Sequence, residues 1–421
     1  MFMKISIINR KNSAYRMIRI IFLLSFILLT SPVTYSEDVK GSNKENYSSE
    51  LQEIQTLAEK GNPEAQFKLG GKYYLGQGVT QDYQQAFKWF SKAAEQGDLK
   101  AQLSLGIMYQ FGQGIAKDYQ QASKWFSKAA EQGDPKAQLF LGEMYFFGEG
   151  VTQDYHQALK WFSKAAENGN LDAQFNLGTM YYEGQGVPQE YQQAFKWFSK
   201  AAAQDNPKAQ YSLGLMYYYG KGVTQNYQQT FTWFSKAAEL GYIDAQFNLG
   251  VMYYKGKGVT QNYQQALKWY IKAAEKGNPE AQYNLSSMYY FGEGVNQDYQ
   301  QALKWTSKAA AQGVPKAQFN LGTMYYYGKG ISQDYQQAYN LFSKAAEQGE
   351  TGAQFNLGVM YHKGQSVPQN YVLSYMWYFI AGANGDKDAM KDRDKIAKNM
   401  TKSQIEEAQL MAQEWLKKHR Q

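Results

Sequence analysis

A segment of 36 residues repeats nine times along this chain of 421 residues, without an insertion or a deletion. The dipeptide Ala-Gln marks the same phase of every unit, first at Ala65 and last at Ala353. A fixed period of about 20–50 residues is typical of solenoids and other repeat arrays. A single unit cannot bury its own apolar face, so its stability depends on stacking against neighbouring units. The period therefore predicts one elongated array over residues 65–388, and it favours binding, because stacking creates a long repeated surface.

The segment 1–36 differs from the array and has the three parts of a secretory signal peptide. Five basic residues precede an apolar run over residues 20–29. Thr34 and Ser36 then place small residues before a cleavage point at Glu37. The apolar run has about ten residues, whereas a membrane-spanning helix needs about 20, so a permanent anchor is the less favoured alternative. We expect cleavage and export, to a periplasm or beyond, with a eukaryotic secretory lumen as the alternative.

Removal of this segment changes the charge of the chain. The formal net charge is +7, and the segment holds five of the positive charges and no Asp or Glu, which leaves about +2. The net charge therefore gives no argument for a nucleic-acid partner. The chain also has no cysteine, which excludes a disulfide framework and a lipid anchor on a cysteine after the apolar run.

The two ends of the array predict caps. Residues 37–50 are polar, as in a flexible leader. An apolar pattern at Leu51, Ile54 and Leu57 then predicts a helix in the phase of half a unit, so residues 51–64 form an N-terminal half-repeat cap. Residues 389–421 leave the period and predict C-terminal capping helices. They contain a capping-box pattern followed by apolar positions on one helix face, namely Thr401 and Gln404, then Ile405, Ala408, Ala412 and Trp415.

Each unit contains two stripes of apolar residues with helical spacing. In the first unit these are Ala65, Leu69 and Tyr73, then Tyr83, Ala86, Trp89 or Phe90, Ala93 and Ala94. Gly76 and Gly78 separate the stripes, since glycine adopts left-handed backbone conformations at little cost. Asp82 lies near the start of the second helix, where a negative charge meets the positive end of the helix dipole. This pattern predicts that each unit forms a helix–turn–helix hairpin and that the chain has an all-α fold.

A glycine inside the first helix, Gly70, recurs in almost every unit. Glycine in a helix interior costs about 1 kcal/mol relative to alanine, so the repetition needs a structural reason. We expect the paired helix to approach closely at this point, on the side opposite Trp89.

These residues resemble the Sel-one-like repeat (SLR) family, a relative of the tetratricopeptide repeat. The family pattern is matched by Ala65, Leu69, Gly70, Tyr73, Gly76, Gly78, Val79, Asp82, Ala86, Trp89, Ala93, Ala94 and Gly97. The departures from it are Ser286, Asp205, Leu341 and Ser366, and asparagine at the acidic position in Asn226, Asn262 and Asn370. The resemblance implies a right-handed α/α solenoid superhelix of nine helix–turn–helix repeats with a C-terminal capping helix.

The resemblance also implies where a partner binds. In tetratricopeptide geometry the first helix of each pair lines a concave groove, which in the first unit corresponds to Glu64, Phe67, Gly71, Tyr74 and Leu75. The lysines expected in the groove are Lys100, Lys136 and Lys208. The expected aromatic residues are Phe67, Phe175, Tyr211, Phe247, Tyr283 and Phe319, and in a second row Tyr74, Tyr182, Tyr218, Tyr254, Tyr290 and Tyr326. An asparagine row runs beside them at Asn176, Asn248, Asn284, Asn320 and Asn356.

Two interpretations of these rows remain open. The aromatic side chains either pack half-buried between adjacent hairpins, or form an exposed track for an extended peptide or sugar rings. The asparagines either bridge neighbouring repeats or form hydrogen bonds with a ligand.

Signals of catalysis are absent from the sequence. The three histidines, at positions 156, 362 and 419, lack metal-ligand spacing, and thiol chemistry is impossible without cysteine. The glycine pairs follow a helix, so they do not indicate a nucleotide-binding loop. We expect no catalytic residue, cofactor or metal.

The resemblance implies an exported scaffold that binds a protein or peptide through its concave face, in envelope regulation or host interaction. The alternative is a module that binds peptidoglycan or another cell-wall glycan, or modulates a wall-cleaving enzyme. A weaker alternative is a β-lactamase-like enzyme, since cysteine-rich members of the family have been linked to β-lactams. This chain lacks their disulfides and has no Ser-x-x-Lys with a Lys-Thr-Gly partner. We expect neither nucleic acid as a partner nor a stable membrane anchor after cleavage.

Overall fold

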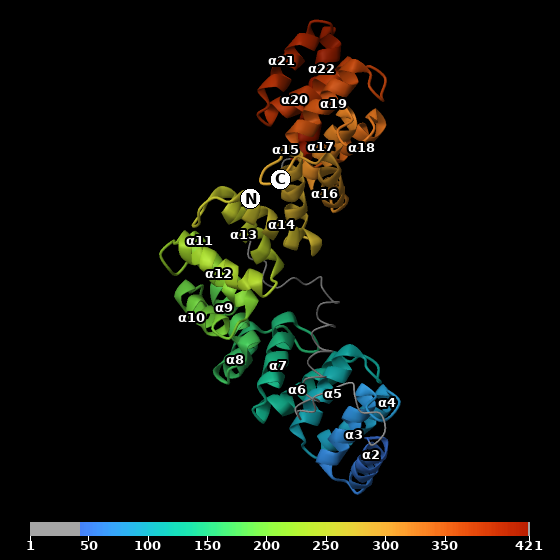
Figure 1. Ribbon diagram of the computed structural model, residues 1–421, viewed down its shortest axis with the longest axis vertical. Coiled ribbons are helices and arrows are strands. Elements are labelled where there is room, and N and C mark those ends of the chain that lie inside the picture. Colours follow the sequence, from blue (N-terminus) through green and yellow to red (C-terminus); the bar gives the residue numbers. More distant parts are fainter. Residues whose placement is uncertain (1–42, 420–421) are drawn as a thin grey trace. The chain divides into compact units, whose positions relative to one another are not determined.

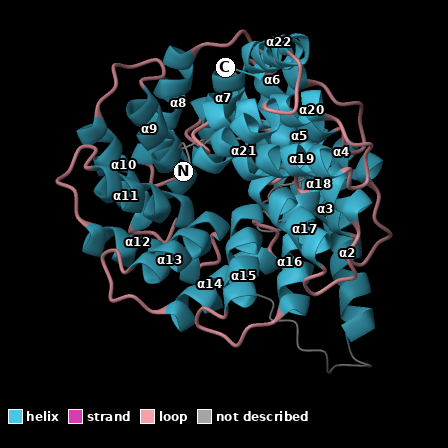
Figure 2. Cartoon of the chain, turned by 90° about the horizontal axis from the view of Figure 1, so that it is seen from above, coloured by secondary structure: helices cyan, strands magenta, loops and turns pink. Residues whose placement is uncertain are grey.

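The computed structural model describes residues 43–419, and every regular element in that range is an α-helix (Figure 2). The chain divides into two compact units, each made of several of the 36-residue repeats. The first unit ends at Gln225 and the second begins at Asn226. Each unit is a series of helical hairpins, as Figure 1 shows. The expectation of an all-α solenoid is therefore confirmed.

The helices of the first unit are α2 (Asn43–Glu59), α3 (Pro63–Leu75), α4 (Tyr83–Glu95), α5 (Leu99–Phe111), α6 (Tyr119–Glu131), α7 (Pro135–Phe147), α8 (Tyr155–Glu167), α9 (Leu171–Glu183), α10 (Tyr191–Ala202) and α11 (Pro207–Tyr219). Those of the second unit are α12 (Tyr227–Glu239), α13 (Ile243–Lys255), α14 (Tyr263–Glu275), α15 (Pro279–Phe291), α16 (Tyr299–Ala311), α17 (Pro315–Tyr327), α18 (Tyr335–Glu347), α19 (Thr351–Lys363), α20 (Tyr371–Ala383), α21 (Lys387–Ala397) and α22 (Lys402–His419). Odd numbers from α3 to α19 denote the first helix of a repeat, and even numbers from α4 to α20 the second.

Capping residues mark where most of the helices begin, and a left-handed glycine ends each first helix. Asp98 precedes α5 and accepts a hydrogen bond from the backbone N–H of Ala101 at 2.7 Å. Asp118 precedes α6 and accepts hydrogen bonds from the N–H groups of Gln120 and Gln121. Each contact satisfies N–H groups that have no partner within the helix. At the other end of α5, Gly112 adopts a left-handed conformation with φ of 71° and closes the helix.

The glutamine of the Ala-Gln dipeptide joins consecutive repeats. Gln66 and its eight counterparts are buried, and each donates from Nε2 to a backbone carbonyl eight residues earlier, at 3.0–3.4 Å. In Gln102 the acceptor is the carbonyl of Ala94, near the end of the preceding second helix. The amide thus gives a second hydrogen bond to a carbonyl in the last turn of that helix, which also accepts from the N–H of Gly97 at 3.1 Å. This position marks the repeat because its hydrogen bond holds one hairpin to the next.

The helix-interior glycine makes the expected close approach, and its partner is an aromatic ring. A Cβ atom on Gly70 would lie 2.7 Å from Cδ1 of Phe90, and the same approach recurs between Gly142 and Phe162. Both phenylalanines are buried in the core of the hairpin. The single repeat with serine at the glycine position, Ser286, carries Thr306 in place of the ring, so the chain itself changes both partners together.

Two of the departures from the family pattern keep the conformation of the glycine that they replace. Asp205 and Ser366 have φ of 58° and 63°, in the left-handed region. Side-chain hydrogen bonds hold both residues, from Gln210 to Asp205 at 3.2 Å and from Ser366 to Gln336 at 2.6 Å. Neither substitution interrupts a helix.

The N-terminal helix starts earlier than expected. α2 begins at Asn43, so residues 43–50 are helical rather than a flexible leader. Leu51 and Ile54 pack against a cluster that includes Leu69 and Trp89, which anchors α2 on the first repeat and allows the polar turns before it to extend the helix. The expected signal peptide lies outside the described residues.

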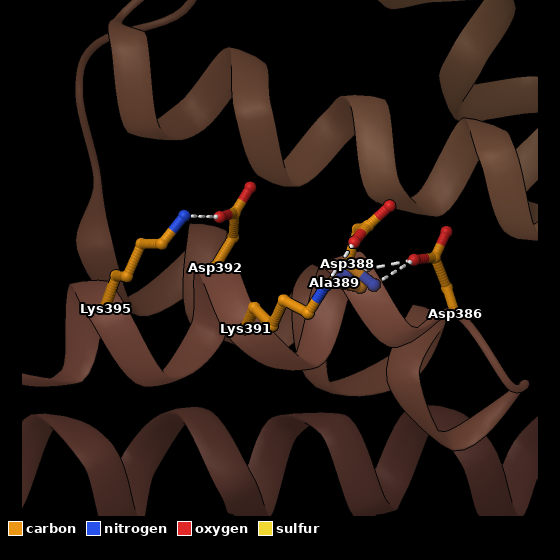
Figure 3. Close-up of polar contacts among 6 residues, drawn as sticks. All are labelled: Asp386, Asp388, Ala389, Lys391, Asp392 and Lys395. Atoms are coloured by element: carbon orange, nitrogen blue, oxygen red, sulfur yellow. Dashed lines mark hydrogen bonds and ion pairs between the residues drawn. The ribbon is translucent and has the colours of Figure 1, made fainter.

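At the C-terminal end, α21 and α22 cover the last repeat. Asp386 caps α21, whose exposed face carries the ion pairs Lys391–Asp388 at 3.0 Å and Lys395–Asp392 at 2.6 Å (Figure 3). The expected capping box is present before α22. The N–H of Thr401 donates to Gln404 Oε1 at 2.9 Å, and the N–H of Gln404 donates to Thr401 Oγ1 at 3.3 Å.

Within residues 43–419, none of the helices combines the length and the apolar character needed to cross a membrane.

Candidate binding surface

The first row of expected groove aromatics packs into the hairpins. Phe67, Phe175 and Tyr211 are buried, while Phe247, Tyr283 and Phe319 are half-buried. The rings of four of them, Phe67, Phe175, Phe247 and Phe319, lie against the core ring of the second helix in the same repeat. The centroids of Phe67 and Phe90 are 5.6 Å apart, and those of Phe319 and Phe342 are 5.9 Å apart. Such pairs contribute about 0.5–1.5 kcal/mol beyond the area that they bury.

The second row links consecutive repeats. Tyr74 and Tyr218 are buried, and Tyr182, Tyr254, Tyr290 and Tyr326 are half-buried. The hydroxyl of Tyr74 donates to Gln113 in the next repeat at 2.9 Å. The equivalent bonds in the second unit run from Tyr254 to Glu293 and from Tyr326 to Gln365, both at 2.7 Å. Both rows therefore do what the packing interpretation describes, and no member of either row is exposed.

This second row predicts an alkaline transition. Burial raises the pKa of Tyr74, Tyr182 and Tyr254 to about 12, and hydrogen bonding to the Glu293 carboxylate adds to the rise at Tyr254. Tyrosine in an unfolded chain titrates near 10. Because the folded-state pKa is the higher one, these neutral tyrosines stabilise the fold fully below about pH 10, and that contribution is lost as the pH rises through about 12.

We expect absorbance at 295 nm to report two populations of tyrosine, one ionising near pH 10 and one near pH 12, with unfolding accompanying the second. Glu293→Gln should lower the pKa of Tyr254, because it removes the carboxylate charge that disfavours the ionised tyrosine. A single titration near pH 10 with the helices intact would contradict the burial of this row.

The asparagine row is enclosed between helices. Asn248 is buried and donates to the carbonyl of Asp244 at 3.0 Å, within its own helix. Asn284 forms a hydrogen bond with the hydroxyl of Tyr270, on the second helix of the preceding repeat. It therefore bridges neighbouring repeats, as one of the two interpretations requires. The other three members, Asn176, Asn320 and Asn356, are half-buried.

The three lysines do not share one environment. Lys100 is exposed. Lys68 lowers the pKa of the Glu64 carboxyl and Lys100 adds to that effect, whereas burial raises the pKa of Asp98 and the charge of Lys100 offsets only part of that rise. Lys136 is half-buried, and burial lowers the pKa of its ammonium group, which the charge of Asp134 partly offsets. Lys208 is also half-buried, with Nζ 5.9 Å from the ring centroid of Phe175. The same register carries acidic residues in other repeats, namely Glu64, Asp172, Asp244 and Glu280, so the row mixes both signs and forms no single cationic site.

The two most exposed aromatic residues lie one position further along the first helices than the second row. Phe291 and Tyr327 end the first helices of consecutive repeats and are 67% and 61% exposed. Each ring lies edge-on against the preceding tyrosine, at 5.0 Å from Tyr290 and 4.8 Å from Tyr326. Burial raises the pKa of Tyr290, and the neighbouring Tyr299 and Tyr327 add to the rise, so Tyr327 of the next repeat lies near Tyr290.

We name these four residues, Tyr290, Phe291, Tyr326 and Tyr327, the aromatic edge. Phe291 and Tyr327 occupy the register of Leu75, which the tetratricopeptide comparison places in the groove. The residue type at this register varies between repeats, and that variation could have identified Phe291 and Tyr327 from the sequence. Several other repeats carry a charged residue there, namely Glu183, Lys255 and Lys363.

Nothing in residues 43–419 resembles a metal centre, since no three His, Cys, Asp or Glu side chains gather there as ligands. His156 is exposed, His362 is half-buried, and His419 stacks on Trp415 with centroids 4.0 Å apart.

Comparison with known proteins agrees with this architecture. The family model of the Sel1 repeat matches nine consecutive segments, 63–98, 99–134, 135–170, 171–206, 207–242, 243–278, 279–314, 315–350 and 351–386. Each segment begins at the first residue of a first helix, two residues before Ala-Gln. No curated protein matches the chain.

Two solved structures are similar over most of their length. One is a protective antigen present in uropathogenic Escherichia coli strains that displays an SLR fold. It is 37% identical, with 87% of this chain and 86% of that chain covered and a TM-score of 0.55. The other is a Sel1 repeat protein from Oxalobacter formigenes. It is 35% identical, with 78% of this chain and 97% of that chain covered and a TM-score of 0.58.

Sel1 repeat proteins are in general scaffolds for protein–protein interaction and are typically not catalytic. The resemblance found in the sequence is thus confirmed over nine repeats. The chain belongs to the Sel1 repeat family.

Proposed function

We propose that this protein is an exported scaffold that binds a partner protein through the aromatic edge. The observation that carries the proposal is the exposure of Phe291 and Tyr327 at the same position of consecutive repeats. Large apolar rings at a surface are favourable only when a partner covers them, and aromatic residues dominate the energetic centres of protein interfaces. Phe291 and Tyr327 occupy the register of Leu75, which the tetratricopeptide comparison places in the groove. The proposal keeps only those groove positions whose side chains are exposed.

The polar groups beside these rings suit an extended protein segment. Lys329 lies 5.8 Å from the ring centroid of Tyr299, at the start of the second helix that faces the edge. Glu293, two residues beyond Phe291, accepts a hydrogen bond from Tyr254 through one carboxylate oxygen. Rings flanked by an ammonium group and a carboxylate offer apolar area together with donors and acceptors for a peptide backbone.

The proposal includes export and an envelope or host-interaction role without catalysis. The N-terminal segment supports export, because it has the charge, apolar and small-residue regions of a signal peptide. The E. coli relative is described as a protective antigen, which supports a role outside the cytoplasm for this chain. A glycan-binding module is the second candidate, because exposed ring faces also stack on sugars. The β-lactamase-like alternative has no support from the described residues.

The test compares Phe291→Ala/Tyr327→Ala with Leu410→Ala, a control on α22 of the same unit whose side chain is 59% exposed. Full chains expressed in a Gram-negative bacterium are recovered from the envelope and medium, and the first residue of the purified protein shows whether cleavage occurs before Glu37. Captured proteins are identified by mass spectrometry, and their affinities are measured with purified components.

We expect the double variant to lose about 2–4 kcal/mol of binding free energy, or roughly 30- to 1000-fold in Kd, and the control to be unchanged. Equal affinities for all three chains would exclude the aromatic edge as the interface. Retention on purified wall glycan with no captured protein would favour the glycan module instead. Hydrolysis of a chromogenic β-lactam above that of heat-denatured protein would overturn the non-catalytic assignment.

A further inference from the structure

The second helices of the first unit carry a surface with a different chemistry. Each of α4, α6, α8 and α10 has two exposed lysines four residues apart. We name these eight residues the lysine face: Lys88 and Lys92, Lys124 and Lys128, Lys160 and Lys164, and Lys196 and Lys200. Four residues make slightly more than one helical turn, so both members of a pair lie on the same side of the helix. The arrangement repeats at every hairpin from α4 to α10.

No carboxylate among residues 43–419 pairs with the positive charges of this face, which are the eight lysine ammonium groups. The acidic residues on these four helices are Glu95, Glu131 and Glu167, each at the last helical position, and α10 has none. Like charges four residues apart disfavour a helix. A repeated unfavourable pair therefore calls for a compensating role.

Packing explains only one lysine of each pair. Lys92, Lys128, Lys164 and Lys200 each place Nζ over the tryptophan of the same helix, at 4.5, 4.1, 4.6 and 4.3 Å from its ring centroid. These lysines also lie in the last turn, where a positive charge interacts favourably with the helix dipole.

The other lysine of each pair has no such explanation. Lys88 and Lys160 lie 5.9 and 5.4 Å from the ring centroid, near the outer limit of about 6 Å for this contact. They and their counterparts Lys124 and Lys196 occupy the middle of the helix, away from its negative end. One exposed cation on each of these four helices, four in the first unit, therefore remains without a role in the fold.

We propose that the lysine face binds a linear polyanion, a chain that carries phosphate or sulfate esters at regular intervals. Charge complementarity identifies the class of ligand, since a row of ammonium groups that recurs at each hairpin matches a row of oxyanions. Lysine presents a compact point charge and does not impose the paired geometry of arginine, so recognition depends on charge density and not on sequence.

A soluble chain fits this face better than a membrane surface. The only large apolar residue counted as exposed on α4, α6, α8 or α10 is Tyr83, at the first position of α4. The face thus offers no apolar side chains to insert among lipids. Binding to a polyanion would release its counterions and so depend strongly on salt.

The experiment uses the full chain with two probes, heparin for sulfate esters and inorganic polyphosphate for phosphate. The test variant is Lys88→Gln/Lys124→Gln/Lys160→Gln/Lys196→Gln, which retains the lysines over tryptophan. The control is Lys60→Gln/Lys68→Gln/Lys117→Gln/Lys221→Gln, which removes four exposed positive charges elsewhere in the same unit. Circular dichroism and urea midpoints establish that both variants fold.

We expect saturable binding of at least one probe, and the test variant should bind at least about tenfold more weakly at 0.1 M salt. The slope of its plot of log K against log salt concentration should also be smaller in magnitude, by up to about three. The affinity and the slope of the control should stay near those of the parent chain. The probe that binds more tightly shows whether the face prefers phosphate or sulfate groups. Equal losses in both variants, or no saturable binding of either probe, would overturn the proposal. Phe291→Ala/Tyr327→Ala should bind both probes normally, which keeps this test independent of the proposed function.

Discussion

Gly142→Ser is expected to destabilise the first unit by about 2 kcal/mol, even though serine is the better helix former. A Cβ atom at this position would lie 2.6 Å from both Cδ1 and Cε1 of Phe162. That ring is 2% exposed in the core of the hairpin, so it has no free space into which to move. Overpacking of this kind costs about 1–3 kcal/mol, which exceeds the few tenths that serine gains over glycine in helix propensity.

The chain supplies the matched control. Ser286 occupies the same position in a repeat where Thr306 replaces the ring, so Ser286→Ala should change stability by less than about 0.5 kcal/mol. In a double-mutant cycle, Gly142→Ser should cost much less on a Phe162→Thr background, because the opposing ring is gone. Urea unfolding monitored by circular dichroism measures all the variants. A full cost on both backgrounds would show that the glycine serves something other than the ring.

Periodicity and short-range chemistry made the hairpins predictable from sequence. The Asp, Asn and Gly residues at fixed offsets act through hydrogen bonds and backbone conformations confined to one turn, as Asp118 and Gly112 do. Even the departures followed this logic, since Ser366 keeps the left-handed conformation of the glycine that it replaces. Nine copies of the same local signals leave little ambiguity about the fold.

The candidate surface was less predictable because exposure depends on neighbouring helices. Tyr290 and Phe291 are adjacent aromatic residues, yet only Phe291 is exposed, because Tyr290 turns towards Tyr299 on the next helix, with centroids 5.2 Å apart. A periodic pattern predicts which residues face the core with an error of about one position. One position along a helix corresponds to a rotation of about 100°, which is enough to exchange a buried side chain for an exposed one. At Gly70 the sequence predicted the close approach of the paired helix, but not that the ring of Phe90 makes it.

The two proposed surfaces differ in the type of helix that forms them. First helices contribute the aromatic edge and second helices the lysine face, and the core residues between them are nearly constant from repeat to repeat. Residues such as Gln102 show that a constant position serves the stacking, because its side chain is buried and bonded to the preceding repeat. Function is therefore more readily sought where the period permits variation, or where a repeated residue is exposed without a structural partner, as Lys124 is.

Ala412→Glu is expected to cause the largest loss of stability in the second unit, about 3–5 kcal/mol. Ala412 is fully buried where α22 packs against Met376 and Ile380 of α20. No cation is part of this apolar cluster, so a carboxylate there would be buried without a partner or would force α22 to detach. Detachment would expose the apolar face of the last repeat, which a terminal cap must cover for a repeat array to stay soluble.

Leu410→Glu is the matched control, because it adds the same charge to the same helix at a side chain that is 59% exposed. We expect that variant to unfold within about 0.5 kcal/mol of the parent chain. Ala412→Glu should unfold in an earlier urea transition and elute partly as aggregate in size-exclusion chromatography. The stability of a repeat array is approximately a sum over neighbouring repeats, so the loss should begin in the C-terminal hairpins and leave protection from hydrogen exchange in the first unit unchanged. If the two variants unfolded together, α22 would not be the element that closes the array.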